Sequence, residues 1–109
     1  MERATERIRM LNDELRRDFS KGHVLITEAV TALGIDAVNQ LLVQVASYDD
    51  FTPENDPYGE HDFGSFRFSG QLVFWKIDYY DLDLNMHSPD PANPAVTERV
   101  LTIMLASEY

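Results

Sequence analysis

The stretch FGSFRFSGQLVFWKIDYY, residues 63–80, constrains the fold of this chain more than any other segment. Phenylalanines alternate with polar residues at its start, and Ser69-Gly70 then supplies a turn signal. Residues 71–80 are the strongest strand candidate in the chain, so the segment 65–80 predicts a β-hairpin. Because successive side chains of a strand point to opposite faces, we expect one face in the core. That face carries Val73, Trp75, Ile77 and Tyr79.

The opposite face of the same strand is chemically mixed. It carries Leu72, Phe74, Lys76, Asp78 and Tyr80. We expect an interior that changes to a polar pocket or rim at the Lys76–Asp78 end.

Helical patterns lie on both sides of this hairpin. Residues 3–19 form an amphipathic pattern, and a second apolar stripe begins after Asp36 as N-cap and ends near residue 48. Between them, residues 23–27 form a short β-branched run, and Thr27 can cap one or two turns of helix. Asn93 as N-cap and Pro94 at the first position predict a last helix, with Val96, Val100, Ile103 and Met104 inward.

These elements predict an α+β domain spanning residues 1–109. Its small antiparallel sheet consists of the hairpin 65–80 and a short strand near 23–27, packed against three main helices. A chain of 109 residues builds one modest core, and 44% apolar residues is typical of a folded protein.

The composition also limits the setting and the chemistry. The chain has no cysteine, which excludes disulfides, thiolate metal sites and a cysteine nucleophile. The opening MERATERIRM lacks the apolar core of a signal peptide, and no apolar run approaches the roughly 20 residues of a membrane span. We therefore expect a cytoplasmic protein with no membrane partner.

Negative charge is concentrated in the middle of the chain. Residues 49–90 hold ten acids and two bases, whereas residues 1–21 hold five acids and six bases. Such a field repels phosphate backbones, so we expect no direct binding of nucleic acid. It attracts basic proteins or divalent cations, although solubility alone also favours acidic surfaces.

The loop FTPENDPYGEHDFG, residues 51–64, is the richest polar segment. Glu60, His61, Asp62, Asp78 and Asp81 supply oxygen and imidazole groups that suit a hard cation. Their spacing matches no calcium loop and no HExxH motif. We assign no metal and no cofactor.

Acid–base chemistry is an alternative for the same loop. His61, flanked by Glu60 and Asp62, can titrate near neutral pH, and Asp62 or Asp78 could orient it or hold a metal. This reading predicts that Glu60, His61 and Asp78 converge around a concavity at the Lys76–Asp78 strand end. No nucleophile motif accompanies these residues, and turn chemistry explains many of them. We assign no catalytic residue, and a non-enzymatic role is favoured.

A recognition surface is the interpretation we favour. Carboxylates interleaved with tyrosines offer contact area and charge to a basic partner, and they can imitate the phosphates of nucleic acid. The predicted partner-binding residues are Asp49, Asp50, Glu54, Asp56, Tyr58, Glu60, His61, Asp62, Asp78, Tyr80, Asp81 and Asp83.

The blocks DDFTPENDPYGEHDFG, FWKIDYYD, SPDPANPAVTERVLTIMLASEY and IRMLNDELRR together resemble the DUF3768 family of small bacterial proteins of unknown function. The resemblance covers nearly the whole chain. It implies a stand-alone domain of about this size, frequent on plasmids and other accessory DNA. It implies no established activity, so it transfers no catalytic residue.

Two functions therefore stay open from the sequence. The first is an inhibitory or interaction domain of anti-CRISPR or anti-restriction type, which binds a basic surface on a nucleic-acid-binding protein of a defence system. The second is a small enzyme or a metal- or ligand-binding domain that uses the GEHDFG loop and the Lys76–Asp78 strand end. A homodimer is compatible with the sequence, which does not require one.

Overall fold

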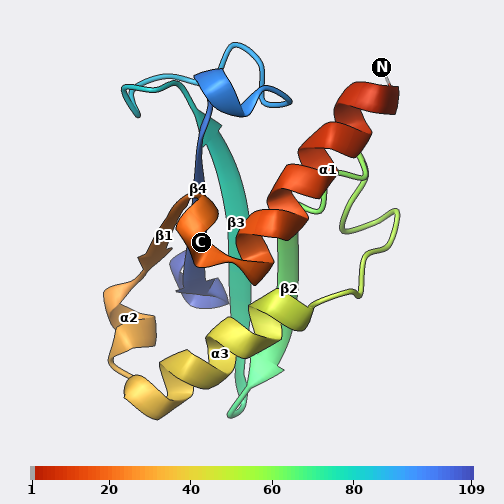
Figure 1. Cartoon of the computed structure of the whole chain (residues 1–109). Helices are drawn as coiled ribbons and strands as arrows, with labels where there is room; N and C mark the ends of the chain where they lie inside the picture. The colour runs from red at the N-terminus through yellow and green to blue at the C-terminus, as the bar shows by residue number, and fades with distance from the viewer. Residues whose placement is uncertain (1) are drawn as a thin grey trace.

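The computed structural model describes residues 2–109 as a four-stranded sheet with three helices on one face (Figure 1). The helices are α1 (Glu2–Arg17), α2 (Glu28–Thr31) and α3 (Ile35–Ser47). Short 3-10 turns lie at Phe19–Lys21, Pro94–Val96 and Ala106–Glu108. The α+β class predicted from the sequence is confirmed. No helix among the described residues is long and apolar enough to cross a membrane.

The sheet has the strand order β1-β4-β3-β2. Its strands are β1 (His23–Ile26), β2 (Phe63–Phe68), β3 (Gln71–Tyr80) and β4 (Glu98–Leu105). β3 runs antiparallel to both of its neighbours, whereas β1 runs parallel to β4. The expectation of a purely antiparallel sheet was therefore wrong, because the short strand near 23–27 adds to the sheet in a parallel direction.

The predicted hairpin is confirmed and begins two residues earlier, at Phe63. Ser69 and Gly70 both have positive φ angles, 51° and 80°. A two-residue hairpin turn of this kind needs left-handed backbone at both central positions, so Gly70 suits its place.

The predicted last helix was wrong. Asn93 does cap a turn, through a hydrogen bond from the Ala95 amide to its side chain, but the turn ends at Val96 and β4 follows. Val100 and Met104 are buried on one face of β4, and Leu101 and Ile103 on the other. A central strand that is covered on both faces has apolar residues at i, i+1, i+3 and i+4, which imitates a helical stripe.

The other helices lie close to their predicted places. α1 ends at Arg17, and Asp18 then caps the 3-10 turn that follows. Thr27 caps α2 as expected, by accepting a hydrogen bond from the Val30 amide. α3 begins one residue before the predicted cap, so Asp36 lies in its first turn and Gly34 is the N-cap.

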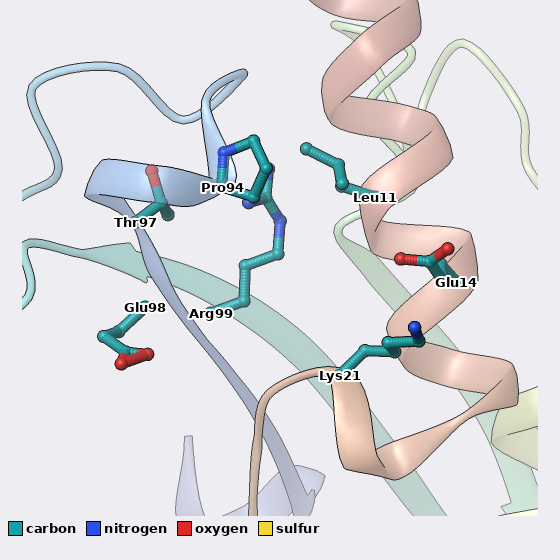
Figure 2. Close-up of a pocket in the computed structure, with 7 residues that line it drawn as sticks. All are labelled: Leu11, Glu14, Lys21, Pro94, Thr97, Glu98 and Arg99. Atoms are coloured by element: carbon teal, nitrogen blue, oxygen red, sulfur yellow. The ribbon is translucent and has the colours of Figure 1, made fainter.

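The core lies between the helices and the inner face of the sheet. Leu15 of α1, Val30 of α2 and Leu41 of α3 contact the inner residues of β3 and β4 there. The inner face of β3 is the one predicted, with Val73, Trp75 and Ile77 buried. A cleft of about 250 Å³ stays open between α1 and the start of β4 (Figure 2).

Trp75 occupies the centre of this core because a glycine lies beside it. Gly64 of β2 pairs with Trp75 of β3, and the indole covers the Gly64 backbone. A Cβ at residue 64 would lie 2.6 Å from Trp75 Cε2 and 2.8 Å from Cζ2. Only glycine fits this contact.

Gly64→Ala should therefore lower the free energy of unfolding, by about 1–3 kcal/mol, because an overpacked core must shift to admit the methyl group. Urea unfolding followed by the fluorescence of Trp75, the one tryptophan, measures this. Ser65→Ala is the matched control on the neighbouring, outward position of β2 and should change the midpoint little. Equal midpoints for Gly64→Ala and the unchanged protein would contradict the packing described.

Candidate functional site

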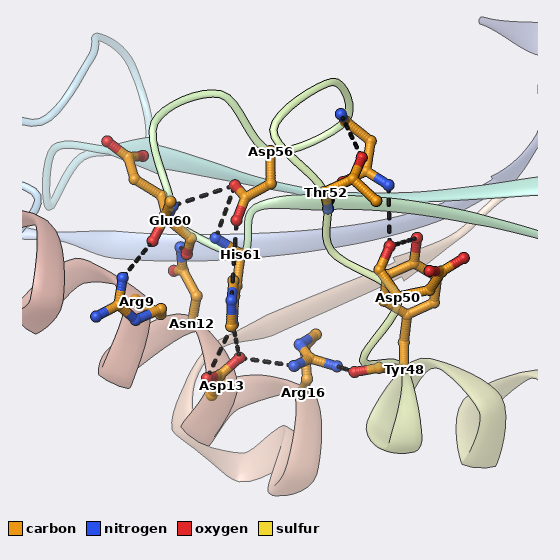
Figure 3. Close-up of polar contacts among 12 residues, drawn as sticks. Arg9, Asn12, Asp13, Arg16, Tyr48, Asp50, Thr52, Asp56, Glu60 and His61 are labelled. Atoms are coloured by element: carbon orange, nitrogen blue, oxygen red, sulfur yellow. Dashed lines mark hydrogen bonds and ion pairs between the residues drawn. The ribbon is translucent and has the colours of Figure 1, made fainter.

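The loop between α3 and β2, residues 48–62, is held in shape by its own side chains (Figure 3). Asp56 is buried, and its Oδ1 accepts hydrogen bonds of 3.1 Å from the amides of Glu60 and His61. Thr52 and Asn55 bond reciprocally, each side chain accepting from the other residue's amide. Much of the polarity of this loop therefore serves its own backbone.

Helix α1 fixes the loop to the rest of the fold. Arg9 donates to the Gly59 carbonyl at 2.9 Å, and Asn12 Nδ2 donates to the Glu60 carbonyl at 3.0 Å. Both contacts join residues about 50 positions apart in the chain. These two hydrogen bonds therefore hold the loop against α1.

Asn12 is also the central residue of a buried hydrogen-bond network that joins α1 to the loop, to β3 and to β4. Its amide donates to the Tyr79 hydroxyl at 2.8 Å, and that hydroxyl donates to Glu60 Oε1 at 2.7 Å. The Asn12 carbonyl oxygen accepts from Arg99 Nε at 2.9 Å. Burial, followed by the nearby Glu60, raises the pKa of Tyr79 far above its usual value, so the hydroxyl keeps its proton.

A second network surrounds Arg16, whose side chain is 1% exposed. Its Nη1 donates to the carbonyls of Val45 and Tyr48 at the end of α3, at 2.8 and 2.9 Å. Its Nη2 donates to Asp13 at 2.6 Å. The guanidinium also lies over the ring of Trp75, 5.1 Å from its centroid.

His61 belongs to this second network. Its Nδ1 lies 3.0 Å from Asp13 Oδ1, and its Nε2 lies 3.8 Å from Asp56 Oδ2. The imidazole stacks on Phe51 with the ring centroids 3.7 Å apart and the planes 3° from parallel. Burial raises the pKa of Asp13, but the hydrogen bonds from Arg16 and His61 outweigh it and hold the pKa below its usual value.

The convergence of Glu60, His61 and Asp78 expected for an acid–base site does not occur. His61 faces Asp13 and Asp56, whereas Asp78 forms an ion pair with Lys76 on the outer face of β3. Among the side chains of residues 4–109, no three histidines or carboxylates are placed to hold a metal ion.

A hollow of about 310 Å³ does form at the predicted strand end. It is lined by Asp62, Ile77, Asp78, Tyr79, Tyr80 and His87. Burial, followed by the charge of Glu60, raises the pKa of Asp62. Asp62, Asp78 and Tyr80, three of the residues singled out from the sequence, line this hollow together with His87, which the sequence did not indicate.

The other predicted partner-binding residues are spread over two segments. Asp49, Asp50, Glu54 and Tyr58 are exposed on the loop between α3 and β2. Asp83 is exposed beyond β3, where Asp81 is partly exposed and accepts a hydrogen bond from the Asn85 amide. Asp56, Glu60 and His61 are instead held in the networks on α1. The predicted set thus divides into exposed carboxylates and inward-facing groups.

A further hollow, of about 360 Å³, lies beside β2, the edge strand. We call it the β2-edge hollow; it is lined by Gln44, Ser47, Tyr48, Asp49, Asp50, Ser65 and Phe66. Burial is the main cause that raises the pKa of the Tyr48 hydroxyl, which donates to the Asp50 carbonyl at 3.1 Å. Two exposed carboxylates and the Tyr48 ring therefore lie together beside the edge strand of the sheet.

Sequence reasoning missed the polar face of α1 and the role of Arg99. Asn12 and Arg16 are fully buried, which the amphipathic pattern of residues 3–19 did not indicate. Their i, i+4 spacing on the Leu15 side of the helix was the one available signal.

Comparison with known proteins identifies a family for this chain. A family model described as a protein of unknown function (DUF3768) matches residues 26–108. The chain belongs to the DUF3768 family. The DUF3768 match begins at the last residue of β1 and includes β2, β3 and β4, so α1 lies outside it. No curated protein and no solved structure gives a significant match.

The Asp13–Arg16–His61 contacts predict a pH dependence of stability. The folded-state pKa of Asp13 lies below the value of about 3.9 expected in the unfolded chain. The stabilisation is therefore complete above about pH 4 and is lost as the pH falls through the lower, folded-state pKa. Asp13→Asn should lower the unfolding free energy by about 1–3 kcal/mol at pH 7, and this deficit should shrink below about pH 4.

Urea unfolding of both proteins between pH 7 and pH 2.5 measures the deficit. Asp49→Asn is the matched control, because Asp49 is exposed and accepts no hydrogen bond within the described residues. A deficit for Asp13→Asn that stays constant down to pH 2.5 would show that the carboxylate charge is not the stabilising feature.

Proposed function

We propose that this chain is a protein-binding domain that covers a cation-rich surface of its partner. The observation that supports this is how the fold distributes its charges. Arg16 and Arg99 are buried, at 1% and 5% exposure, whereas most carboxylates are exposed or partly exposed. The exposed surface is accordingly more acidic than the net charge of −10 alone indicates.

The exposed carboxylates of the loop between α3 and β2 have no basic side chain of the described residues as an ion-pair partner. Among the described residues, no basic side chain lies within the 4.0 Å ion-pair distance of Asp49, Asp50 or Glu54. Arg9, the base that does reach this loop, donates to a backbone carbonyl. Unpaired surface carboxylates attract a basic partner over several ångströms and speed its association.

The β2-edge hollow is the part of this surface that best fits a contact. Asp49 and Asp50 flank it, and Tyr48 and Phe66 give it an apolar wall against β2. A lysine or arginine side chain combines an apolar stem with a charged end, which suits this lining. Glu54 and Tyr58, exposed on the same loop, would extend the contact.

A nucleic-acid-binding groove is the partner surface that matches such chemistry. Lysines and arginines in these grooves are spaced to meet phosphates, and a folded acidic loop can present carboxylates in their place. We therefore infer an inhibitory role against a nucleic-acid-binding protein, for example a nuclease of a CRISPR or restriction system. The chain would act by competing with nucleic acid for the groove.

A second candidate function rests on the hollow at the end of β3. Asp62 and Asp78 line it together with Tyr80 and His87, which suits a small cationic ligand. The inward position of His61 removes the base that an enzymatic version of this idea requires. Ligand binding without catalysis is the form of the alternative that the geometry supports.

Competition for a basic groove can be tested with purified nucleases of defence systems. Each nuclease is titrated with the chain while its binding to labelled duplex DNA is followed by fluorescence anisotropy. We expect at least one nuclease to release its DNA, with an affinity for the chain that falls by tenfold or more between about 50 and 200 mM salt.

Charge variants locate the contact. Asp49→Asn, Asp50→Asn and Glu54→Gln together should weaken binding, whereas Glu6→Gln, Glu28→Gln and Asp36→Asn remove the same charge from exposed helical positions and should have little effect. Equal effects of the two triple variants, or binding that ignores salt, would refute the proposal. Loss of binding only in Asp62→Asn/Asp78→Asn would assign recognition to the hollow at the end of β3.

A further inference from the structure

The guanidinium of Arg99 is a buried cation without an acidic partner. Its Nε donates to Asn12, its Nη2 donates to the Pro91 carbonyl, and it lies over the Tyr79 ring at 5.1 Å. No carboxylate of residues 4–109 lies within 4.0 Å of it. Burial lowers the pKa of Arg99, and the nearby Tyr79 and Glu60 offset this only in part.

The cleft between α1 and the start of β4 gives this cation access to a ligand (Figure 2). Arg99, Pro94 and Thr97 form one wall. Leu11 and Glu14 point from α1 toward that wall, and Lys21 closes the lower end. Arg99 Nη1 donates to no acceptor within the described residues, so one nitrogen of the buried guanidinium stays available.

Lys21 is held near the cleft by the glycine that follows it. A Cβ at Gly22 would lie 2.9 Å from the Arg99 carbonyl oxygen and 3.1 Å from Leu15, so the chain passes close to β4 there. Lys21 itself forms no ion pair with any side chain of residues 4–109. Two cations, one buried and one exposed, are thus placed at the same cleft by separate segments of the fold.

We propose that this cleft binds a small aliphatic carboxylate. A carboxylate oxygen would accept from Arg99 Nη1, the exposed Lys21 side chain would supply a second positive charge from the lower end of the cleft, and the alkyl part would lie against Leu11 and Pro94. The volume of about 250 Å³ suits a ligand of a few carbon atoms and is small for a nucleotide. This site is independent of the protein-binding function, because it shares no residue with the β2-edge hollow.

The acids near the cleft favour a carboxylate over a phosphate. Glu14 points into the cleft, and its charge repels a dianion more strongly than a monoanion. Glu98 also lines the cleft, but its Oε2 lies 3.3 Å from His23 Nε2 and its carboxylate points away from Arg99 in Figure 2. The charges around the cleft therefore favour a ligand with one negative charge over a ligand with two.

Titration of the ¹⁵N-labelled chain with sodium butyrate tests the site. Sodium chloride at equal ionic strength is the blank, and sodium phosphate is the competing anion. We expect saturable changes in the amide signals of Lys21, Thr97 and Arg99, and weaker binding of phosphate than of butyrate.

Variants of an exposed residue keep the fold intact in this test. Lys21→Met should weaken butyrate binding by about fivefold or more, Lys21→Arg should retain it, and Lys76→Met, which removes a cation from the outer face of β3, should leave it unchanged. Linear, non-saturating changes, equal affinities for Lys21→Met and the unchanged chain, or tighter binding of phosphate would each overturn the proposal.

Discussion

The arrangement of helices and loop depends on the guanidinium of Arg16. It joins α1 to the last carbonyls of α3 and lies over the rings of Phe51 and Trp75, while Asp13 supplies its counter-charge. A cation buried in this way is costly unless hydrogen bonds and a counter-charge replace its lost hydration, which the two carbonyls and Asp13 do for Nη1 and Nη2. The positions of α1, of the end of α3 and of the loop after it are therefore set together, and His61 is drawn inward because Asp13 is already there.

The same constraint separates the charges of the molecule. Arg16 and Arg99 lie inside, where backbone carbonyls, Asn12, aromatic rings and, for Arg16, the Asp13 carboxylate hold them, so they do not neutralise the exposed carboxylates of the loop. Both proposed sites follow from this separation. The acidic surface at the β2 edge is available to a basic partner, and the unmatched guanidinium of Arg99 is available to a small anion. Both proposals thus depend on the charge distribution that folding creates.

The parts of the fold that depend on residues close together in the chain could be predicted from the sequence. Alternation and the Ser69-Gly70 turn were enough for the hairpin, and Asn93 and Pro94 correctly marked a cap. β4 was misread because a strand covered on both faces shares the apolar spacing of a helix. The buried role of Arg16 was not predictable, since its partners at residues 45 and 48 and the rings of Phe51 and Trp75 are distant in sequence. For the same reason, the inward turn of His61 could not be read from the loop alone.

Two arginines lie inside a protein most of whose carboxylates are exposed or partly exposed. The exchange of arginine Nε–H protons with water, followed by NMR at neutral pH, tests this most directly. The signals of Arg16 and Arg99 should persist and exchange much more slowly than those of the exposed Arg17 and Arg67. Exchange of Arg16 and Arg99 at the rate of the exposed arginines would contradict the account.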